Sequence, residues 1–303
     1  MPMKRMRTSY LNDAFFSRLE ACALNLRSDL SGFFGGKHLV KTYGQTVEFA
    51  DYREYMLGDD IRRIDWNLYS RFEKYFLKLF TDERQMHTQI FLDCSGSMGR
   101  FDEKKAAYAT ATAAAIGFLS VHNMDKVSFK LMRESGAEDP FGVLVGKRAF
   151  FRAVAGLEDI EFDGETDIAA SVTGSECGTA DGLTVIISDF MTDSNWKKAV
   201  DYLIYKKRQV LLMQILTPEE IDPSYSGNLN LLDSEAADQF DDRNLRLKIT
   251  SGMLSAYSEA LSDFVAGIKD FCSSRGAGFI TVNSGQPIER MLFGELLKVG
   301  IIK

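Results

Sequence analysis

Residues 90–98, which read Ile-Phe-Leu-Asp-Cys-Ser-Gly-Ser-Met, decide the fold of this chain. The apolar run that ends in Asp93 predicts a short, buried β-strand. The loop after it can turn at Gly96, and a helix is predicted to follow, from about residue 101 to residue 122. A buried strand, a polar loop and a helix in this order are typical of parallel α/β sheets, which bind ligands beyond the carboxyl ends of their strands.

The same alternation of apolar strands and helices continues toward the end of the chain. Further strands are predicted at residues 126–132, 183–188, 210–216 and 278–282, and further helices at residues 148–157, 194–207, 251–274 and 288–298. Uninterrupted apolar strands of this kind predict an α/β fold, with a doubly wound, mostly parallel sheet and helices on both faces. Residues 222–248 lack a clear pattern, and we expect an irregular insertion there.

Residues 1–84 depart from this pattern and predict a smaller N-terminal satellite, which leaves residues 85–303 as the main domain. The division suits the length, since single cores rarely grow beyond roughly 250–300 residues. An amphipathic helix is expected from residue 12 or 13 to about residue 28, and a strand at residues 74–81 is expected to run beside or into the main sheet. The mixed charges around residues 59–65 favour a local network of ion pairs and turns over a docking surface.

The composition is that of an ordinary globular protein, with 45% apolar and 26% charged residues. A net charge of −7 without any run rich in Lys or Arg argues against nucleic-acid binding. No membrane span is expected, because the longest uncharged stretch, residues 106–121, falls short of the roughly 20 apolar residues that a span requires. Four widely spaced cysteines and the lack of a visible secretory signal predict a reduced, cytoplasmic protein.

A second apolar strand also ends in an acid, because residues 185–190 read Val-Ile-Ile-Ser-Asp-Phe. In a parallel sheet its carboxylate, that of Asp189, would emerge at the same edge as that of Asp93. Between the two strands, residues 164–167 read Gly-Glu-Thr-Asp before a predicted helix. This loop can bring the hydroxyl of Thr166 to the same edge of the sheet.

Two carboxylates and three hydroxyls are hard oxygen ligands, which suit a hard divalent cation. The donor set favours Mg²⁺, with Mn²⁺ or Ca²⁺ as alternatives, and it disfavours zinc because His and Cys ligands are missing. The candidate metal ligands are Asp93, Ser95, Ser97, Thr166 and Asp189.

The three motifs together, Asp-x-Ser-x-Ser, Gly-x-Thr-Asp and Ser-Asp, resemble the metal-ion-dependent adhesion site of von Willebrand factor type A domains. The resemblance implies that Ser95, Ser97 and Thr166 approach the metal directly or by exchange. It also implies that Asp93 and Asp189 act largely through water, and that a sixth position awaits the carboxylate of a protein partner. One departure is Glu165, which stands where a small residue is common and adds a charge close to the ion.

The segment before the first strand carries a second, longer resemblance. Residues 47–55 read Val-Glu-Phe-Ala-Asp-Tyr-Arg-Glu-Tyr and residues 58–66 read Gly-Asp-Asp-Ile-Arg-Arg-Ile-Asp-Trp. Together with Gly-Lys-His at residues 36–38 and Asp-Glu-Arg at residues 82–84, they resemble the DUF58 family. This resemblance implies partnership with MoxR-type AAA+ ATPases, as an adaptor or co-chaperone, and it implies no catalytic activity.

Two other interpretations compete with a metal-dependent binding module. Ser and Asp are favoured at helix N-termini and in turns, so the Asp-x-Ser-x-Ser loop alone could be a helix cap. The match of Thr166 and Asp189, in the expected order and context, favours metal binding instead.

The other interpretation is a Mg²⁺-dependent phosphoester hydrolase that uses a strand-end Asp as phosphoryl acceptor. Hydrolases of the haloacid dehalogenase type place a second carboxylate two residues after the nucleophile, where this chain has Ser95, and they need a Lys partner that the sequence does not reveal. No Gly-x-x-x-x-Gly-Lys-Ser/Thr loop for a nucleoside triphosphate is present either. We therefore expect a protein-binding module and not an enzyme.

Overall fold

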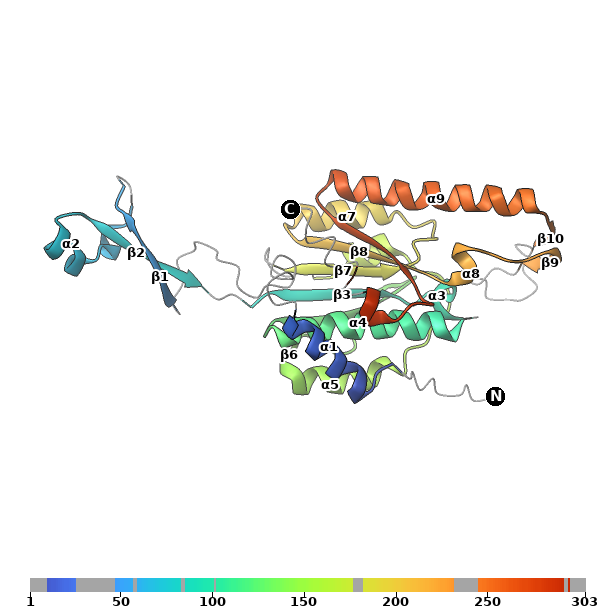
Figure 1. Ribbon diagram of the computed structural model, residues 1–303, viewed down its shortest axis with the longest axis horizontal. Helices are drawn as coiled ribbons and strands as arrows, with labels where there is room; N and C mark the ends of the chain where they lie inside the picture. Colours follow the sequence, from blue (N-terminus) through green and yellow to red (C-terminus); the bar gives the residue numbers. More distant parts are fainter. Residues whose placement is uncertain are drawn as a thin grey trace. The chain divides into compact units, whose positions relative to one another are not determined.

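The computed structural model describes residues 10–25, 47–56, 59–82, 85–100, 102–176, 182–231, 245–291 and 294. The chain forms two compact units. The main unit combines residues 1–34 with residues 86–303, and the smaller unit comprises residues 35–85. Figure 1 shows the elements of both units.

A seven-stranded sheet forms the centre of the main unit, with the strand order β11-β8-β7-β3-β4-β5 and with β6 paired to β4. The parallel strands are β3 (His87–Asp93), β4 (Lys126–Arg133), β7 (Leu183–Ser188), β8 (Gln209–Leu216) and β11 (Gly278–Asn283). Two short strands, β5 (Gly136–Glu138) and β6 (Leu144–Val145), pair with β4 in the antiparallel direction. The predicted mostly parallel α/β sheet is therefore confirmed.

Strands β3 and β7 lie side by side in the middle of the sheet. Ile90 faces Val185 and Leu92 faces Ile187 in their parallel register. These side chains are almost fully buried, as expected for strands covered by helices on both faces. The pairing brings the carboxyl ends of both strands to one edge of the sheet.

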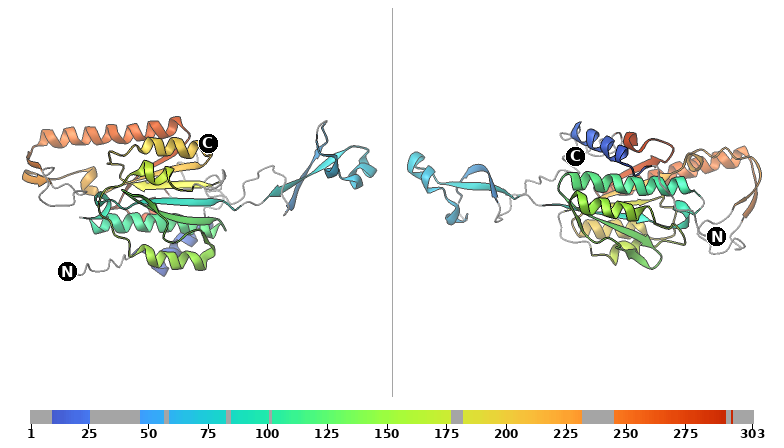
Figure 2. Two further views of the ribbon diagram at one scale, coloured as in Figure 1. Left: turned by 180° about the vertical axis from the view of Figure 1, so that it is seen from behind. Right: turned by 90° about the horizontal axis from the view of Figure 1, so that it is seen from below.

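Helices cover both faces of the sheet, as Figure 1 and Figure 2 show. Helices α1 (Asp13–Asn25), α4 (Glu103–His122) and α5 (Gly146–Leu157) contribute to one hydrophobic cluster, and α6 (Ile168–Thr173), α7 (Trp196–Tyr205) and α9 (Ser251–Ser274) to another. The Ala-rich helix α4 is buried along nearly its whole length. Of the helices in the described ranges, none has both the length and the hydropathy to cross a bilayer.

Helix α1 belongs to the main unit, whereas the sequence pattern placed residues 1–84 together in the satellite. Its apolar face buries Phe15, Phe16 and Leu19. The ring of Phe16 lies 5.3 Å from that of Phe118 and 6.0 Å from that of Phe150, which belong to α4 and α5. An amphipathic helix shows in its sequence that it must be buried, but not which surface it covers.

The smaller unit contains an antiparallel pair of strands, β1 (Val47–Glu54) and β2 (Phe76–Asp82). Strand β2 thus pairs with β1 in its own sheet and does not enter the seven-stranded sheet. Between them lie a 3-10 turn, η2 (Ile61–Arg63), and helix α2 (Trp66–Phe72).

The charged residues of the smaller unit make the local network that their mixed signs predict. Arg53 forms an ion pair of 2.8 Å with Asp59, and the side chain of Asp60 caps η2. Asp65 caps α2 by accepting a hydrogen bond from the Asn67 amide, and it also accepts one from the Tyr52 hydroxyl. These carboxylates therefore fix turns within the unit.

The segment predicted as an irregular insertion, residues 222–248, contains regular structure. Strands β9 (Gly227–Leu231) and β10 (Leu245–Ile249) form a two-stranded antiparallel sheet, and residues 232–244 lie outside the described residues. Both strands alternate apolar and polar residues, as in Leu-Arg-Leu-Lys-Ile. This period of two is the sequence signal that would have identified them. The predicted helix at residues 288–298 is described only in part, and residues 288–291 are helical.

Candidate metal centre

The two strand-end carboxylates lie at the edge where β3 and β7 end. Asp93 is the last residue of β3, and Asp189 directly follows β7. Each is only 2% exposed. Burial raises the pKa of Asp93 above its usual value, and the nearby charge of Asp189 raises it further. The two acids are thus close enough to repel each other, and a cation between them would relieve that repulsion.

The loop after β3 directs its hydroxyls to one place. The Ser95 amide donates to Asp93 Oδ1 at 3.0 Å, and the Ser188 hydroxyl donates to Asp93 Oδ2 at 2.6 Å. The Oγ atoms of Ser95 and Ser97 lie 3.0 Å apart. Two neighbouring ligands of an octahedral Mg²⁺ are separated by a similar distance, about 2.9 Å, because each bond is about 2.0–2.1 Å long.

Ser95 occupies the N-cap position of the short helix α3 (Gly96–Gly99), yet its side chain makes no capping hydrogen bond. This observation argues against the helix-cap interpretation of the Asp-x-Ser-x-Ser loop. Ser95 is only 2% exposed, and its hydroxyl is directed toward that of Ser97 instead. The loop therefore presents hydroxyl oxygens that capping does not use.

The loop that carries Thr166 is held against the loop after β3 by backbone hydrogen bonds. The Gly96 amide donates to the Gly164 carbonyl at 2.8 Å, and the Asp163 amide donates to the Cys94 carbonyl at 2.9 Å. Gly164 has a φ of 74°, a left-handed conformation that glycine adopts without strain. This turn delivers Thr166, which is 6% exposed, to the buried edge of the sheet.

The side chain of Thr166 lies beside the Asp93 carboxylate, and a hydrogen bond between them lowers the pKa of Asp93. Its hydroxyl also donates to the Met132 carbonyl at 3.3 Å. The next residue, Asp167, has a structural role, because it caps α6 at the Ala170 amide and accepts a hydrogen bond from Ser194. The structure thus brings the five predicted ligands to one edge of the sheet and leaves Asp167 outside the set.

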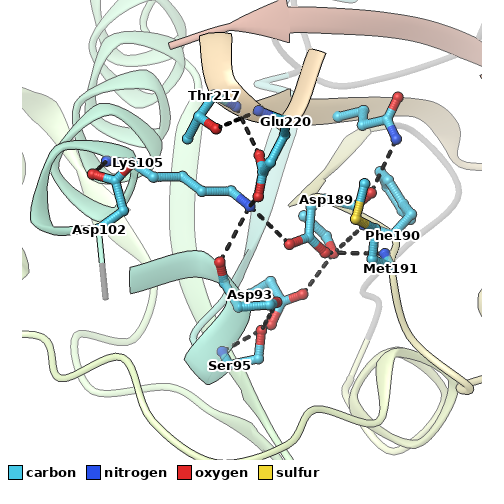
Figure 3. Close-up of polar contacts among 12 residues, drawn as sticks. Asp93, Ser95, Asp102, Lys105, Asp189, Phe190, Met191, Thr217 and Glu220 are labelled. Atoms are coloured by element: carbon cyan, nitrogen blue, oxygen red, sulfur yellow. Dashed lines mark hydrogen bonds and ion pairs between the residues drawn. The ribbon is translucent and has the colours of Figure 1, made fainter. Parts of the chain in front are cut away.

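Sequence reasoning missed Lys105, whose ammonium group lies inside the site (Figure 3). Lys105 Nζ lies 2.9 Å from Asp189 Oδ2, 2.8 Å from Glu220 Oε1 and 3.2 Å from the Ser97 carbonyl oxygen. Burial acts to lower the pKa of Lys105, but the adjacent charges of Asp189 and Glu220 outweigh it and raise the pKa. The side chain therefore stays charged although only 1% of it is exposed.

Glu220 was missed as well. It belongs to helix α8 (Pro218–Ile221), where it forms a capping box with Thr217. Its second oxygen, Oε2, accepts a hydrogen bond from the Thr217 amide at 2.7 Å. Lys105 is the first buried residue of α4, which is buried on all sides, so no periodic pattern in its sequence singles out this lysine. The contact between Lys105 and Glu220 could not be predicted from a local sequence pattern, because 115 positions separate the two residues.

The charges of the site leave room for a divalent cation. Asp93, Asp189 and Glu220 are acids, and Lys105 is the one base among the described residues that bond to them directly. With all four ionised, two negative charges remain without a cation. Together with the hydroxyls of Ser95, Ser97 and Thr166, this charge and donor set fits Mg²⁺ or a similar hard ion.

A family model described as "Protein of unknown function DUF58" matches residues 51–254. The chain belongs to the DUF58 family. Among its relatives are the uncharacterized proteins Rv1480 of Mycobacterium tuberculosis and Mb1516 of Mycobacterium bovis. Each is 25% identical to this chain over 241 residues, which cover 78% of this chain and 75% of the relative.

Solved structures similar to this DUF58 protein include BatB from Bacteroides thetaiotaomicron, with 15% identity, a TM-score of 0.42 and coverage of 71% of this chain and 99% of BatB. Another is mussel byssus proximal thread matrix protein 1 with a zinc-occupied MIDAS motif, with 11% identity, a TM-score of 0.39 and coverage of 71% and 48%. A third is manganese-loaded TRAP protein of Plasmodium vivax, with 14% identity, a TM-score of 0.33 and coverage of 43% and 57%. In this chain the carboxyl ends of β3 and β7 and the loop between α5 and α6 meet at one edge of a mostly parallel sheet.

Proposed function

We propose that this DUF58 protein is a metal-ion-dependent protein-binding module. In the proposal a divalent cation, Mg²⁺ or alternatively Mn²⁺ or Ca²⁺, is held at the adhesion-type site and recruits a carboxylate from a protein partner. Ser95, Ser97 and Thr166 supply direct oxygen ligands, and Asp93 and Asp189 act through water. The observation that carries the proposal is the hydrogen-bonded pair of hydroxyls of Ser95 and Ser97, 3.0 Å apart, beside the buried carboxylate of Asp93.

We further propose that the partner is a MoxR-type AAA+ ATPase and that the protein acts as its adaptor or co-chaperone. Membership of the DUF58 family supports this partner, because the family resemblance implied it. We propose that the protein is cytoplasmic, and the free thiols of Cys94 and Cys272 agree with a reduced environment. Cys94 and Cys272 are free and buried, and burial raises the pKa of the Cys94 thiol to about 12, so neither supplies a reactive thiolate.

The alternative function, a Mg²⁺-dependent phosphoester hydrolase, gains one element from Lys105, since such enzymes need a lysine near the acid. The Lys105 ammonium group, however, bonds to Asp189, Glu220 and the Ser97 carbonyl and is nearly fully buried. Both oxygens of Asp93 also accept hydrogen bonds from the protein. These contacts favour a binding site without a nucleophile, and we propose no enzymatic activity. Turnover of generic phosphoesters in Mg²⁺ that is lost in Asp93→Asn would favour the hydrolase instead.

Co-purification with the MoxR-type ATPase tests the proposed partnership. The full chain should retain the ATPase in Mg²⁺ and release it in a chelator, and Ser95→Ala should not retain it in either buffer. Asp163→Asn is the matched control, because this acid lies on the Thr166 loop but its side chain is 68% exposed and pairs with Arg100. Equal retention by the wild type and Ser95→Ala would contradict the proposal.

A further inference from the structure

A groove of about 950 Å³ lies next to the candidate metal centre. One wall is formed by the loops at residues 165–167 and 190–194, and the other by helix α9. Thr166, a candidate metal ligand, lines the groove itself. One end of the groove therefore lies beside the candidate metal centre.

Polar and apolar side chains both line the groove, and the apolar ones come from helix α9 and from the loop after β7. Helix α9 contributes Tyr257, Leu261 and Phe264, which lie three and four residues apart and so share one face of the helix. Opposite them, the loop after β7 contributes Phe190, which is buried, and Met191, which is 39% exposed. Tyr257 is 37% exposed, so aromatic and aliphatic surface remains available to a ligand. The exposed apolar side chains in this concave surface can pack against large apolar side chains of a ligand.

The rim of the groove is acidic. Glu134, Glu165, Asp167 and Asp193 all line it, and no Lys or Arg does so among the described residues. A bound cation would neutralise charge only at the Thr166 end of the groove. A partner whose sole charged group is a carboxylate would therefore meet repulsion along the remaining rim, and basic side chains on the partner would turn this repulsion into attraction.

We infer that the groove binds a protein segment in which the acidic metal ligand is accompanied by bulky apolar side chains and by Lys or Arg. The carboxylate of the segment meets the cation, its apolar side chains pack on Tyr257 and Leu261 of α9, and its basic side chains face the acidic rim. This inference rests on the proposed function, because the cation anchors one end of the segment. It adds the chemistry that lets the protein select among carboxylate-bearing partners.

Peptide display against the immobilised full chain tests the inference. The probe is a library of short peptides with one fixed Asp and random flanking residues, selected in Mg²⁺. Large apolar residues and Lys or Arg should be enriched on the same side of the fixed Asp. The best peptides, resynthesised with a fluorophore, are then measured by anisotropy against the wild type and its variants.

The charge of the rim is tested by the double variant Glu134→Lys and Asp193→Lys, which should weaken the selected basic peptides about tenfold or more. Leu261→Ser should weaken them as well, through the lost apolar contact. Asp270→Lys is the matched control for charge, because Asp270 is an exposed acid on the same helix that does not line the groove. This control should leave the affinity within about twofold.

The outcomes separate the inference from the function on which it rests. One outcome is peptides that need Mg²⁺ and Ser95 but show no basic or apolar preference and bind the rim variant and Leu261→Ser as tightly as the wild type. This outcome would overturn the inference about the groove and leave the proposed metal-dependent module intact. Peptides that bind equally well in chelator and to Ser95→Ala would overturn the proposed function. A library without any enriched peptide would contradict the groove inference. Circular dichroism of each variant establishes that it is folded.

Discussion

The ammonium group of Lys105 places one positive charge inside the candidate metal centre. It joins Asp189, a candidate metal ligand from the β7 edge, to Glu220 of α8. A buried ion pair of this kind adds little net stability when it is complete, but the loss of one partner leaves an uncompensated buried charge. Lys105 is therefore best described as a positioning residue that holds Asp189 at the candidate metal centre.

Replacement of Lys105 by Met should lower the free energy of unfolding by about 3–5 kcal/mol in a chelator, because Asp189 then remains buried without the ammonium group. Addition of Mg²⁺ should restore part of this loss, since the metal would supply positive charge next to Asp189. Urea denaturation with and without Mg²⁺ measures both effects. Lys104→Met is the matched control, because Lys104 is the exposed neighbour on the same helix, and it should change the stability by less than about 0.5 kcal/mol. An unchanged stability of Lys105→Met in chelator would contradict this role.

Two loops from different parts of the chain meet at the sheet edge, and their contact depends on one backbone conformation. Gly164 has a φ of 74°, and its carbonyl accepts the hydrogen bond from the Gly96 amide of the serine loop. A side chain at this position would strain the turn that places Thr166 beside Asp93. Gly164 is not a candidate metal ligand, yet its backbone conformation helps to set the geometry of the candidate metal centre.

Gly164→Ala should lower the affinity for Mg²⁺ severalfold or more, because the strained loop displaces the Thr166 hydroxyl. Gly142→Ala is the matched control, since Gly142 has a similar φ of 63°, and an added Cβ at either position meets no atom within 4 Å. Each variant should lose about 1–2 kcal/mol of stability from the left-handed conformation. Thermal unfolding and metal titration of the pair separate the two effects. An equal affinity in both variants would contradict a role of this loop in metal binding.

The elements differ in how far the sequence alone could predict them. The strand ends at Asp93 and Asp189 were predictable, because apolar runs of strand length that end in an acid are a local pattern. Strands β9 and β10 were missed although they alternate, since each has only five residues. The contact of Lys105 with Glu220 was out of reach, because it depends on how α4 and α8 pack, which no local pattern contains.

Over the whole main unit, the strand order explains why one edge of the sheet collects the site. Strand β3 pairs with β7, so the residues that follow these two strands are neighbours in space. The loop between α5 and α6 joins them through its backbone hydrogen bonds to the loop after β3. Lys105 and Glu220 extend the site to α4 and α8, and Tyr257 of α9 donates a hydrogen bond of 2.7 Å to the Glu220 carbonyl. A metal ion at the edge would therefore interact with parts of the sheet and of both helical layers. The position of helix α1 in this unit was not predictable from its amphipathic pattern alone.

Isothermal titration of the chelator-treated full chain with Mg²⁺ tests most directly whether Asp93, Ser95, Ser97, Thr166 and Asp189 bind a divalent cation. The wild type and the Asp163→Asn control should bind one ion per chain. Asp93→Asn and Ser95→Ala should show no measurable heat of binding while remaining folded by circular dichroism. A wild type that binds neither Mg²⁺ nor Mn²⁺, or variants that bind as tightly as the wild type, would contradict the account.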